Sequence, residues 1–144
     1  MLSLAGGCRH IDSASLDKKL IEAVKNGSPA EIKSLVDAGA NVNARNESQR
    51  TVLMLAALKG RSENVETLLA RGAKINETDS DKMTALMWAA FGGSSHTVKV
   101  LMDHGADIAS RDAKGETALN WAGARSGNSD VVRMLKDNST KRVP

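Results

Sequence analysis

The chain has 144 residues and a formal net charge of +3, a length that fits one domain. Hydrophobic residues make up 41% and charged residues 26%, so the chain can bury a core and does not have the composition of a disordered protein. One Phe, two Trp and no Tyr disfavour a β-sandwich and a surface that stacks nucleic-acid bases, and a single cysteine excludes an internal disulfide. The excess of basic residues lies at the C-terminal end rather than along the body, so we expect no nucleic-acid partner.

Residues 1–13 are predicted to form a flexible N-terminal segment. The run from Leu2 to Cys8 resembles the cleavage site of a bacterial lipoprotein precursor, but it lacks the charged part and most of the apolar part of such a signal. We therefore expect a cytoplasmic protein. The alternative is a bacterial periplasmic or lipid-anchored protein with a truncated signal sequence, acting as a protective or inhibitory subunit. No apolar run approaches the roughly 18 residues that a membrane-spanning helix needs.

From residue 14 onward the chain repeats itself with a period of 33 residues. Gly39, Gly72 and Gly105 each precede an alanine at this interval, and threonine, leucine and alanine positions keep the same interval. Such a period is typical of stacked repeat proteins. The units are 14–46, 47–79, 80–112 and 113–138, followed by a basic C-terminal tail over 139–144.

Each unit is predicted to contain two short helices and a loop. In the second unit, the first helix covers about 51–58 with Thr51 as its N-cap, and the second covers about 62–71 with its apolar residues on one face. Gly72 then ends the second helix, because the position after a helix commonly needs a positive φ. Asn138 stands at the corresponding place in the last unit and predicts a helix end there.

A single pair of such helices cannot bury its apolar side, so the units are expected to stack and to be stabilised by contacts between neighbours. The end units should then be polar on their outer sides. The first unit fits this expectation with Lys18, Lys19, Glu22 and Lys25.

Three segments resemble the ankyrin repeat: TVLMLAA at 51–57, TALMWAA at 84–90 and TALNWAG at 117–123. The resemblance covers about 14–138. It implies an all-α solenoid of four repeats, terminal caps included, in which helix-turn-helix units are joined by β-hairpin-like loops. Hairpin tips and first helices would line a concave face. Proteins of this family usually bind other proteins without catalysis, so the resemblance implies a protein partner and no enzymatic activity. We also expect a monomer.

The chain departs from the family pattern in its turns. Where the family has Pro and His after the threonine, this chain has Val52, Ala85 and Ala118, and Met54, Met87 and Asn120. The glycine of the hairpin turn survives only as Gly115, with Gln49 and Lys82 in the other two hairpins. We therefore expect less preorganised turns, in which two non-glycine residues adopt the turn backbone or store strain.

By the same resemblance, a partner would contact the residues that differ between units on the concave face. They are Glu47, Arg50, Asp81, Met83, Lys114 and Glu116 on the hairpins and Leu58, Lys59, Trp88, Phe91, Trp121 and Arg125 on or just after the first helices. Trp and Arg are frequent anchors of interfaces. Alternatively, both Trp rings fill gaps between first helices.

No catalytic, metal or cofactor site is predicted. His104 lies beside Asp103 and near Asp107, but a histidine in the last turn of a helix interacts favourably with the helix dipole, which explains it without a metal. Apart from Arg9 and His10 beside it, Cys8 has no His or Asn in a definable relation to it, so a catalytic thiol is not supported. No glycine-rich loop has the context of a phosphate-binding motif.

Overall fold

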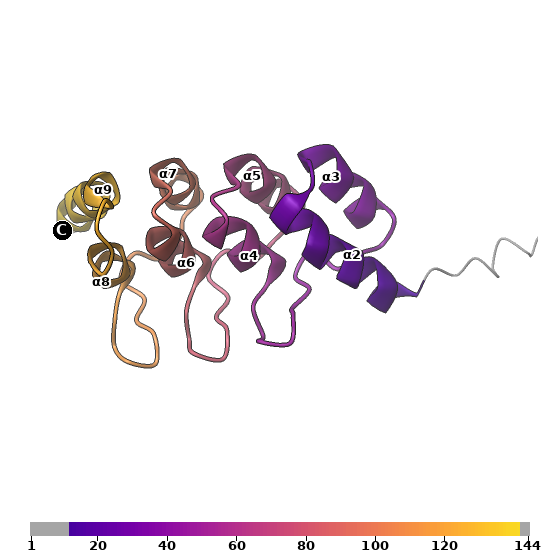
Figure 1. The fold of residues 1–144 in the computed structure, drawn as a ribbon, viewed down its shortest axis with the longest axis horizontal. Helices are drawn as coiled ribbons and strands as arrows, with labels where there is room; N and C mark the ends of the chain where they lie inside the picture. The colour runs from indigo at the N-terminus through magenta and orange to yellow at the C-terminus, as the bar shows by residue number, and fades with distance from the viewer. Residues whose placement is uncertain (1–11, 142–144) are drawn as a thin grey trace, which may run out of the picture.

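The computed structural model describes residues 12–141, which form eight helices (Figure 1). In chain order they are α2 (Ser13–Asn26), α3 (Pro29–Asp37), α4 (Val52–Leu58), α5 (Ser62–Ala70), α6 (Ala85–Gly92), α7 (Ser95–Asp103), α8 (Ala118–Gly123) and α9 (Ser129–Lys141). Within this range the only β pairing is an isolated antiparallel bridge between Arg45 and Thr51. The prediction of an all-α fold is confirmed. The expectations for Cys8 and for most of 1–13 concern residues outside the described range.

The helices form four pairs arranged in a row (Figure 1). The first helices of the pairs, α2, α4, α6 and α8, contact one another in sequence and form one layer. The second helices, α3, α5, α7 and α9, do the same in a second layer. The loops that join successive pairs project on the side of the first helices (Figure 1). The chain is therefore a solenoid, in which each unit packs on its neighbours.

Small and apolar side chains fill the space between the first helices. Ala56, Ala57, Ala89 and Ala90 are all completely buried in α4 and α6. Alanine at consecutive positions leaves room for the neighbouring backbone to approach closely, and larger residues such as Leu68 complete the core beneath the second helices.

Threonine caps three of the first helices, as the sequence predicts. The Thr51, Thr84 and Thr117 hydroxyls accept hydrogen bonds from the third amide of the helix that follows. In return, the Thr84 amide lies 3.5 Å from the sulfur of Met87, and the Thr117 amide donates to Oδ1 of Asn120 at 2.9 Å. A thioether or an amide thus completes the reciprocal cap where the family has histidine. This compensation was not predicted from the sequence.

Two hairpin turns place a non-glycine residue in the left-handed region. Gln49 and Lys82 have φ of 62° and 61°, and Gly115 has φ of 81° at the corresponding position. The same turn bond forms in all three cases, from the amide of Gln49, Lys82 or Gly115 to a carbonyl three residues earlier. The turn backbone is therefore kept, at the conformational cost that a side chain imposes at positive φ.

The last unit is polar where inner units are buried. Asn120 is exposed, whereas Met87 at the corresponding position in the third unit is 1% exposed. Arg133 replaces buried Val100 and pairs with Asp130 at 3.0 Å. This end of the stack is therefore capped, as repeat architecture requires.

The prediction that a helix ends at Asn138 is wrong, because α9 continues to Lys141. The Asn138 amide side chain donates to the carbonyl oxygen of Met134 at 2.8 Å, and the Ser139 hydroxyl donates to that of Leu135 at 2.8 Å. These side chains support the helix instead of stopping it. The part of the predicted tail from 139 to 141 is consequently helical.

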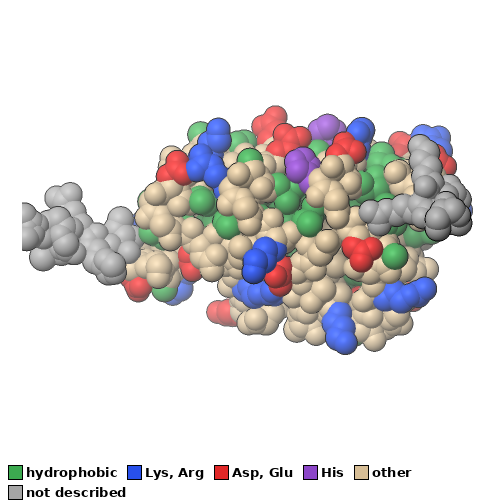
Figure 2. Space-filling view, turned by 180° about the vertical axis from the view of Figure 1, so that it is seen from behind, with side chains coloured by type: hydrophobic (Ala, Val, Ile, Leu, Met, Phe, Trp, Pro, Cys, Tyr) green, Lys and Arg blue, Asp and Glu red, His purple; other side chains and the backbone are tan. Residues whose placement is uncertain are grey.

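The surface carries both charges. Seen from behind, Lys and Arg side chains lie among Asp and Glu side chains over the visible face (Figure 2). Among the described helices, none combines the length and the apolar character that crossing a membrane requires.

Candidate binding face

The base of each hairpin is organised by one side chain. In the hairpin before α6, Oδ1 of Asp79 accepts hydrogen bonds from the amides of Asp81 at 2.9 Å and Met83 at 3.0 Å. Oδ2 of the same carboxylate accepts from Nε1 of Trp88 at 3.0 Å. The carboxylate therefore ties the hairpin to the first helix of its own unit.

The next hairpin repeats this arrangement with Asp112. Its Oδ1 accepts from the amides of Lys114 and Glu116, both at 2.9 Å, and its Oδ2 accepts from Nε1 of Trp121 at 2.8 Å. In the first hairpin the neutral Asn46 accepts the corresponding amide bonds. Two successive units thus hold an indole in a fixed orientation.

Arg50 covers Trp88. Its guanidinium carbon lies 4.1 Å from the centre of the Trp88 ring, and its Nε lies 3.9 Å from Oδ2 of Asp79. Cation–π attraction and the nearby carboxylate favour this position. Trp88 is consequently 8% exposed and belongs to the core.

Three rings form a continuous row across the third and fourth units, which we call the aromatic row: Trp88, Phe91 and Trp121. Trp88 and Phe91 are edge to face with centroids 6.0 Å apart, and Phe91 and Trp121 are edge to face at 5.6 Å. Arg125 lies over Phe91 at 5.2 Å and donates from a terminal nitrogen to the Phe91 carbonyl oxygen at 3.2 Å. Phe91 and Trp121 are only partly buried, so the row is open to a partner at these two rings.

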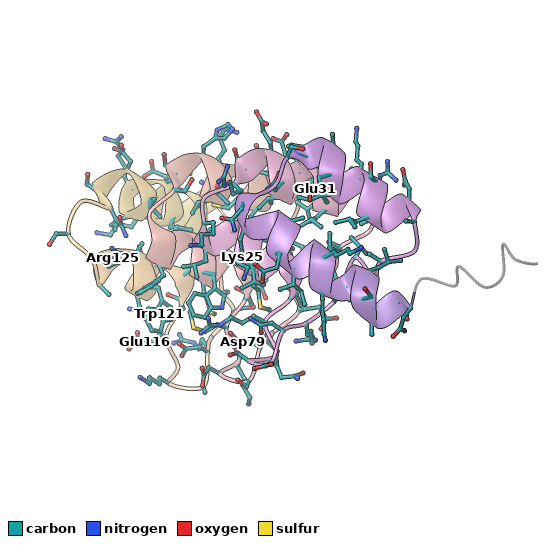
Figure 3. The ribbon with its side chains drawn as sticks, turned by 45° about the vertical axis from the view of Figure 1, so that its right-hand side comes forward. Lys25, Glu31, Asp79, Glu116, Trp121 and Arg125 are labelled. Atoms are coloured by element: carbon teal, nitrogen blue, oxygen red, sulfur yellow. The ribbon has the colours of Figure 1, made fainter. Side chains whose placement is uncertain are left out.

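A surface hollow of about 340 Å³ adjoins the open end of the row. Trp121, Glu116 and Asn120 are among its lining residues. Figure 3 shows Arg125, Trp121 and Glu116 following one another from the helix end of the last unit toward its hairpin. The Trp121 ring therefore lies between the cationic Arg125 and the anionic Glu116 (Figure 3).

The structure sorts the predicted contact residues into three groups. Glu47, Lys59, Asp81, Lys114 and Arg125 are exposed. Arg50, Leu58, Phe91, Glu116 and Trp121 are partly exposed.

The other two, Met83 and Trp88, are buried, with 4% and 8% of their surface exposed. The structure therefore corrects the prediction that these two residues are available to a partner. Met83 lies at the hairpin base that Asp79 organises, and its side chain packs in the core. Of the two readings of the Trp pair, gap filling describes Trp88, whereas Trp121 keeps an open surface.

Asp79 and Asp112 are not among the residues predicted from the sequence. Each lies nine residues before the tryptophan that it holds, and the two are 33 residues apart. This shared spacing is visible in the sequence and could have identified the pair.

His104 is the C-cap of α7 and contacts its own helix. Its Nδ1 lies 2.8 Å from the carbonyl oxygen of Val100, one turn earlier. His96 is exposed on α7. These positions agree with a structural role for His104.

Asp112 has a lowered pKa. Burial alone would raise the pKa of this carboxyl, but hydrogen bonds from the Glu116 amide, the Trp121 indole and the Lys114 amide outweigh burial and bring it below the ordinary value of 3.8. Folding therefore stabilises the ionised form of the Asp112 carboxyl group.

This shift predicts acid sensitivity. The folded pKa is the lower one, so the contribution of Asp112 to stability is complete above the ordinary value and is lost as the pH falls through the folded pKa. Urea unfolding followed from about pH 5 to about pH 2 should show a smaller loss of stability for Asp112→Asn than for the wild type. Glu47→Gln, at an exposed hairpin tip, is the control and should behave like the wild type. Equal pH dependence in Asp112→Asn and wild type would contradict the assignment.

The row of stacked helix pairs with hairpins on one side defines a helical repeat protein. A family model that describes three copies of the ankyrin repeat matches the chain over residues 12–79 and again over residues 71–143. No curated protein sequence matches the chain. The chain belongs to the ankyrin repeat family. Repeats of this family are generally protein–protein interaction modules and are generally non-catalytic.

Proposed function

We propose that this chain is a non-catalytic interaction module that binds a partner protein on the face formed by its hairpins and first helices, which we call the binding face. The observation that carries the proposal is the pair of partly exposed rings, Phe91 and Trp121, which lie edge to face at 5.6 Å. The Trp121 ring is held by Asp112, and the Phe91 ring is covered on one side by Arg125.

Rigid rings suit this role because little conformational entropy is lost when a partner covers them. Aromatic residues are also the side chains whose truncation most often weakens an interface. The charged hairpin residues around them, such as Glu47 and Lys114, are exposed and can set the rate and specificity of association.

Affinity capture from the native host, followed by mass spectrometry, tests the proposal. The double variant Phe91→Ala/Trp121→Ala should retain at least about tenfold less of any partner than the wild type, because both rings act as anchors. Lys99→Ala, at an exposed site on α7, is the matched control and should capture like the wild type. The proposal is wrong if the double variant is folded by circular dichroism and captures the same proteins in the same amounts.

A further inference from the structure

The ends of the first helices carry two cations that are not part of any ion pair found among residues 12–141. Lys59 is the C-cap of α4 and Arg125 follows α8, and both are exposed. Two cations of the hairpins have carboxylate partners, Arg45 with Glu77 and Arg50 with Asp79. In the repeat register, Lys59 and Arg125 occupy the same position two units apart.

The position between these two cations is Gly92, and it has to be glycine. A Cβ at Gly92 would lie 2.6 Å from the carbonyl oxygen of Leu58, which is backbone and cannot move aside cheaply. Close packing of α6 on α4 therefore leaves no side chain at Gly92, the position midway between Lys59 and Arg125. Leu58 and Phe91, partly exposed one position earlier, form an apolar floor beside this gap.

Arg125 is positioned to receive an anion. It uses one terminal nitrogen for the Phe91 carbonyl and rests over the Phe91 ring. A guanidinium has five N–H donors, so donors remain for a carboxylate, and the ring contact limits the side chain's freedom.

The opposite edge of the binding face is different. The exposed carboxylates of Glu47 and Asp81 and the partly exposed carboxylate of Glu116 lie on the hairpins. Lys82 and Lys114 are also exposed on the hairpins, so this edge carries charges of both signs and gives an acidic partner no net attraction, whereas the helix-end edge offers Lys59 and Arg125.

We propose that the binding face accepts an acidic protein segment, with one carboxylate at Lys59, a second at Arg125 and a bulky apolar side chain between them on Phe91 and Trp121. This inference rests on the proposed function and specifies its partner. Two helix spacings separate the cations, about 16 to 20 Å. An extended chain covers this distance in about five or six residues, which sets the expected separation of the two acidic residues.

A display library of random 12-residue peptides, panned against the full chain, tests the proposal. The captured pool should be enriched in Asp or Glu pairs about five residues apart with Leu, Phe or Trp between them. A synthetic peptide from that pool should bind Lys59→Glu/Arg125→Glu at least about tenfold more weakly than the wild type by fluorescence anisotropy. Its affinity for the wild type should fall as salt is raised.

The matched control is Lys33→Glu/Lys99→Glu, which makes the same change in net charge at two exposed residues of the second helices α3 and α7. It should change the affinity by no more than about twofold, since those charges lie away from the site. A pool without acidic enrichment, or an equal loss of affinity in both double variants, overturns the acidic-segment proposal.

The two proposals fail in different ways. If capture depends on Phe91 and Trp121 but the pool is neutral or basic, the proposed function stands and the acidic partner is wrong. If capture is unchanged in Phe91→Ala/Trp121→Ala, or if the wild type captures nothing, both are wrong.

Discussion

Asp79→Ala should lower the free energy of unfolding by about 3 to 5 kcal/mol. The Asp79 side chain is 1% exposed, and its carboxylate accepts hydrogen bonds from two hairpin amides and from the Trp88 indole. Alanine removes every one of these acceptors, which leaves the buried indole N–H and the Met83 amide without partners. Urea denaturation followed by circular dichroism measures the loss.

Two variants separate the causes. Asp79→Asn keeps one side-chain oxygen, which can still accept from the hairpin amides. Toward Trp88 it presents either an NH₂ group, which cannot accept a hydrogen bond, or the oxygen that the hairpin already uses. The free energy of unfolding should therefore lie between the values of the wild type and Asp79→Ala. Asp81→Ala removes an exposed carboxylate two residues away and should cost less than about 0.5 kcal/mol. A loss below about 1 kcal/mol for Asp79→Ala, within the cost of one ordinary hydrogen bond, would show that the carboxylate does not hold the hairpin.

Trp88→Ala is expected to cost about 3 to 5 kcal/mol, because it empties a buried site the size of an indole. It also leaves the Asp79 carboxylate without its indole donor and Arg50 without its ring. Trp121→Ala should cost roughly half as much, since that ring is partly exposed already. The measurement is again urea denaturation, now with the two variants compared under the same conditions.

Trp88→Phe tests the indole N–H by itself. Phenylalanine keeps much of the ring and removes the donor to Asp79, so the loss should be clearly smaller than for Trp88→Ala. Equal losses for Trp88→Ala and Trp121→Ala would contradict the different roles that burial gives to the two rings.

The repeat frame could be predicted because it depends on local chemistry that recurs. Threonine caps a helix through its own hydroxyl, and Gly72 and Gly105 adopt φ of 93° and 91° at the positions where the sequence requires a helix end. Such features need only a few neighbouring residues, and the period of 33 residues shows them several times over.

The features that could not be predicted depend on the placement of single side chains, either between units or within one helix. The burial of Trp88 follows from Arg50 in the preceding hairpin, which covers the ring. The sulfur caps follow from how the Met54 and Met87 side chains turn back on their threonines. The helix end predicted at Asn138 was wrong because a residue that can end a helix can also continue one, here by donating a side-chain hydrogen bond to the preceding turn.

Within residues 12–141, the fourth helix pair packs against the third pair through α6 and α7. Its own buried residues are few, with Ala118 and Ala122 in α8 and Val131 and Leu135 in α9. A ligand spanning Phe91 and Trp121 would bridge the joint between the third and fourth pairs. By mass action, occupancy would then protect this pair from local opening and slow its amide hydrogen exchange, so that recognition and the integrity of the C-terminal end become thermodynamically linked.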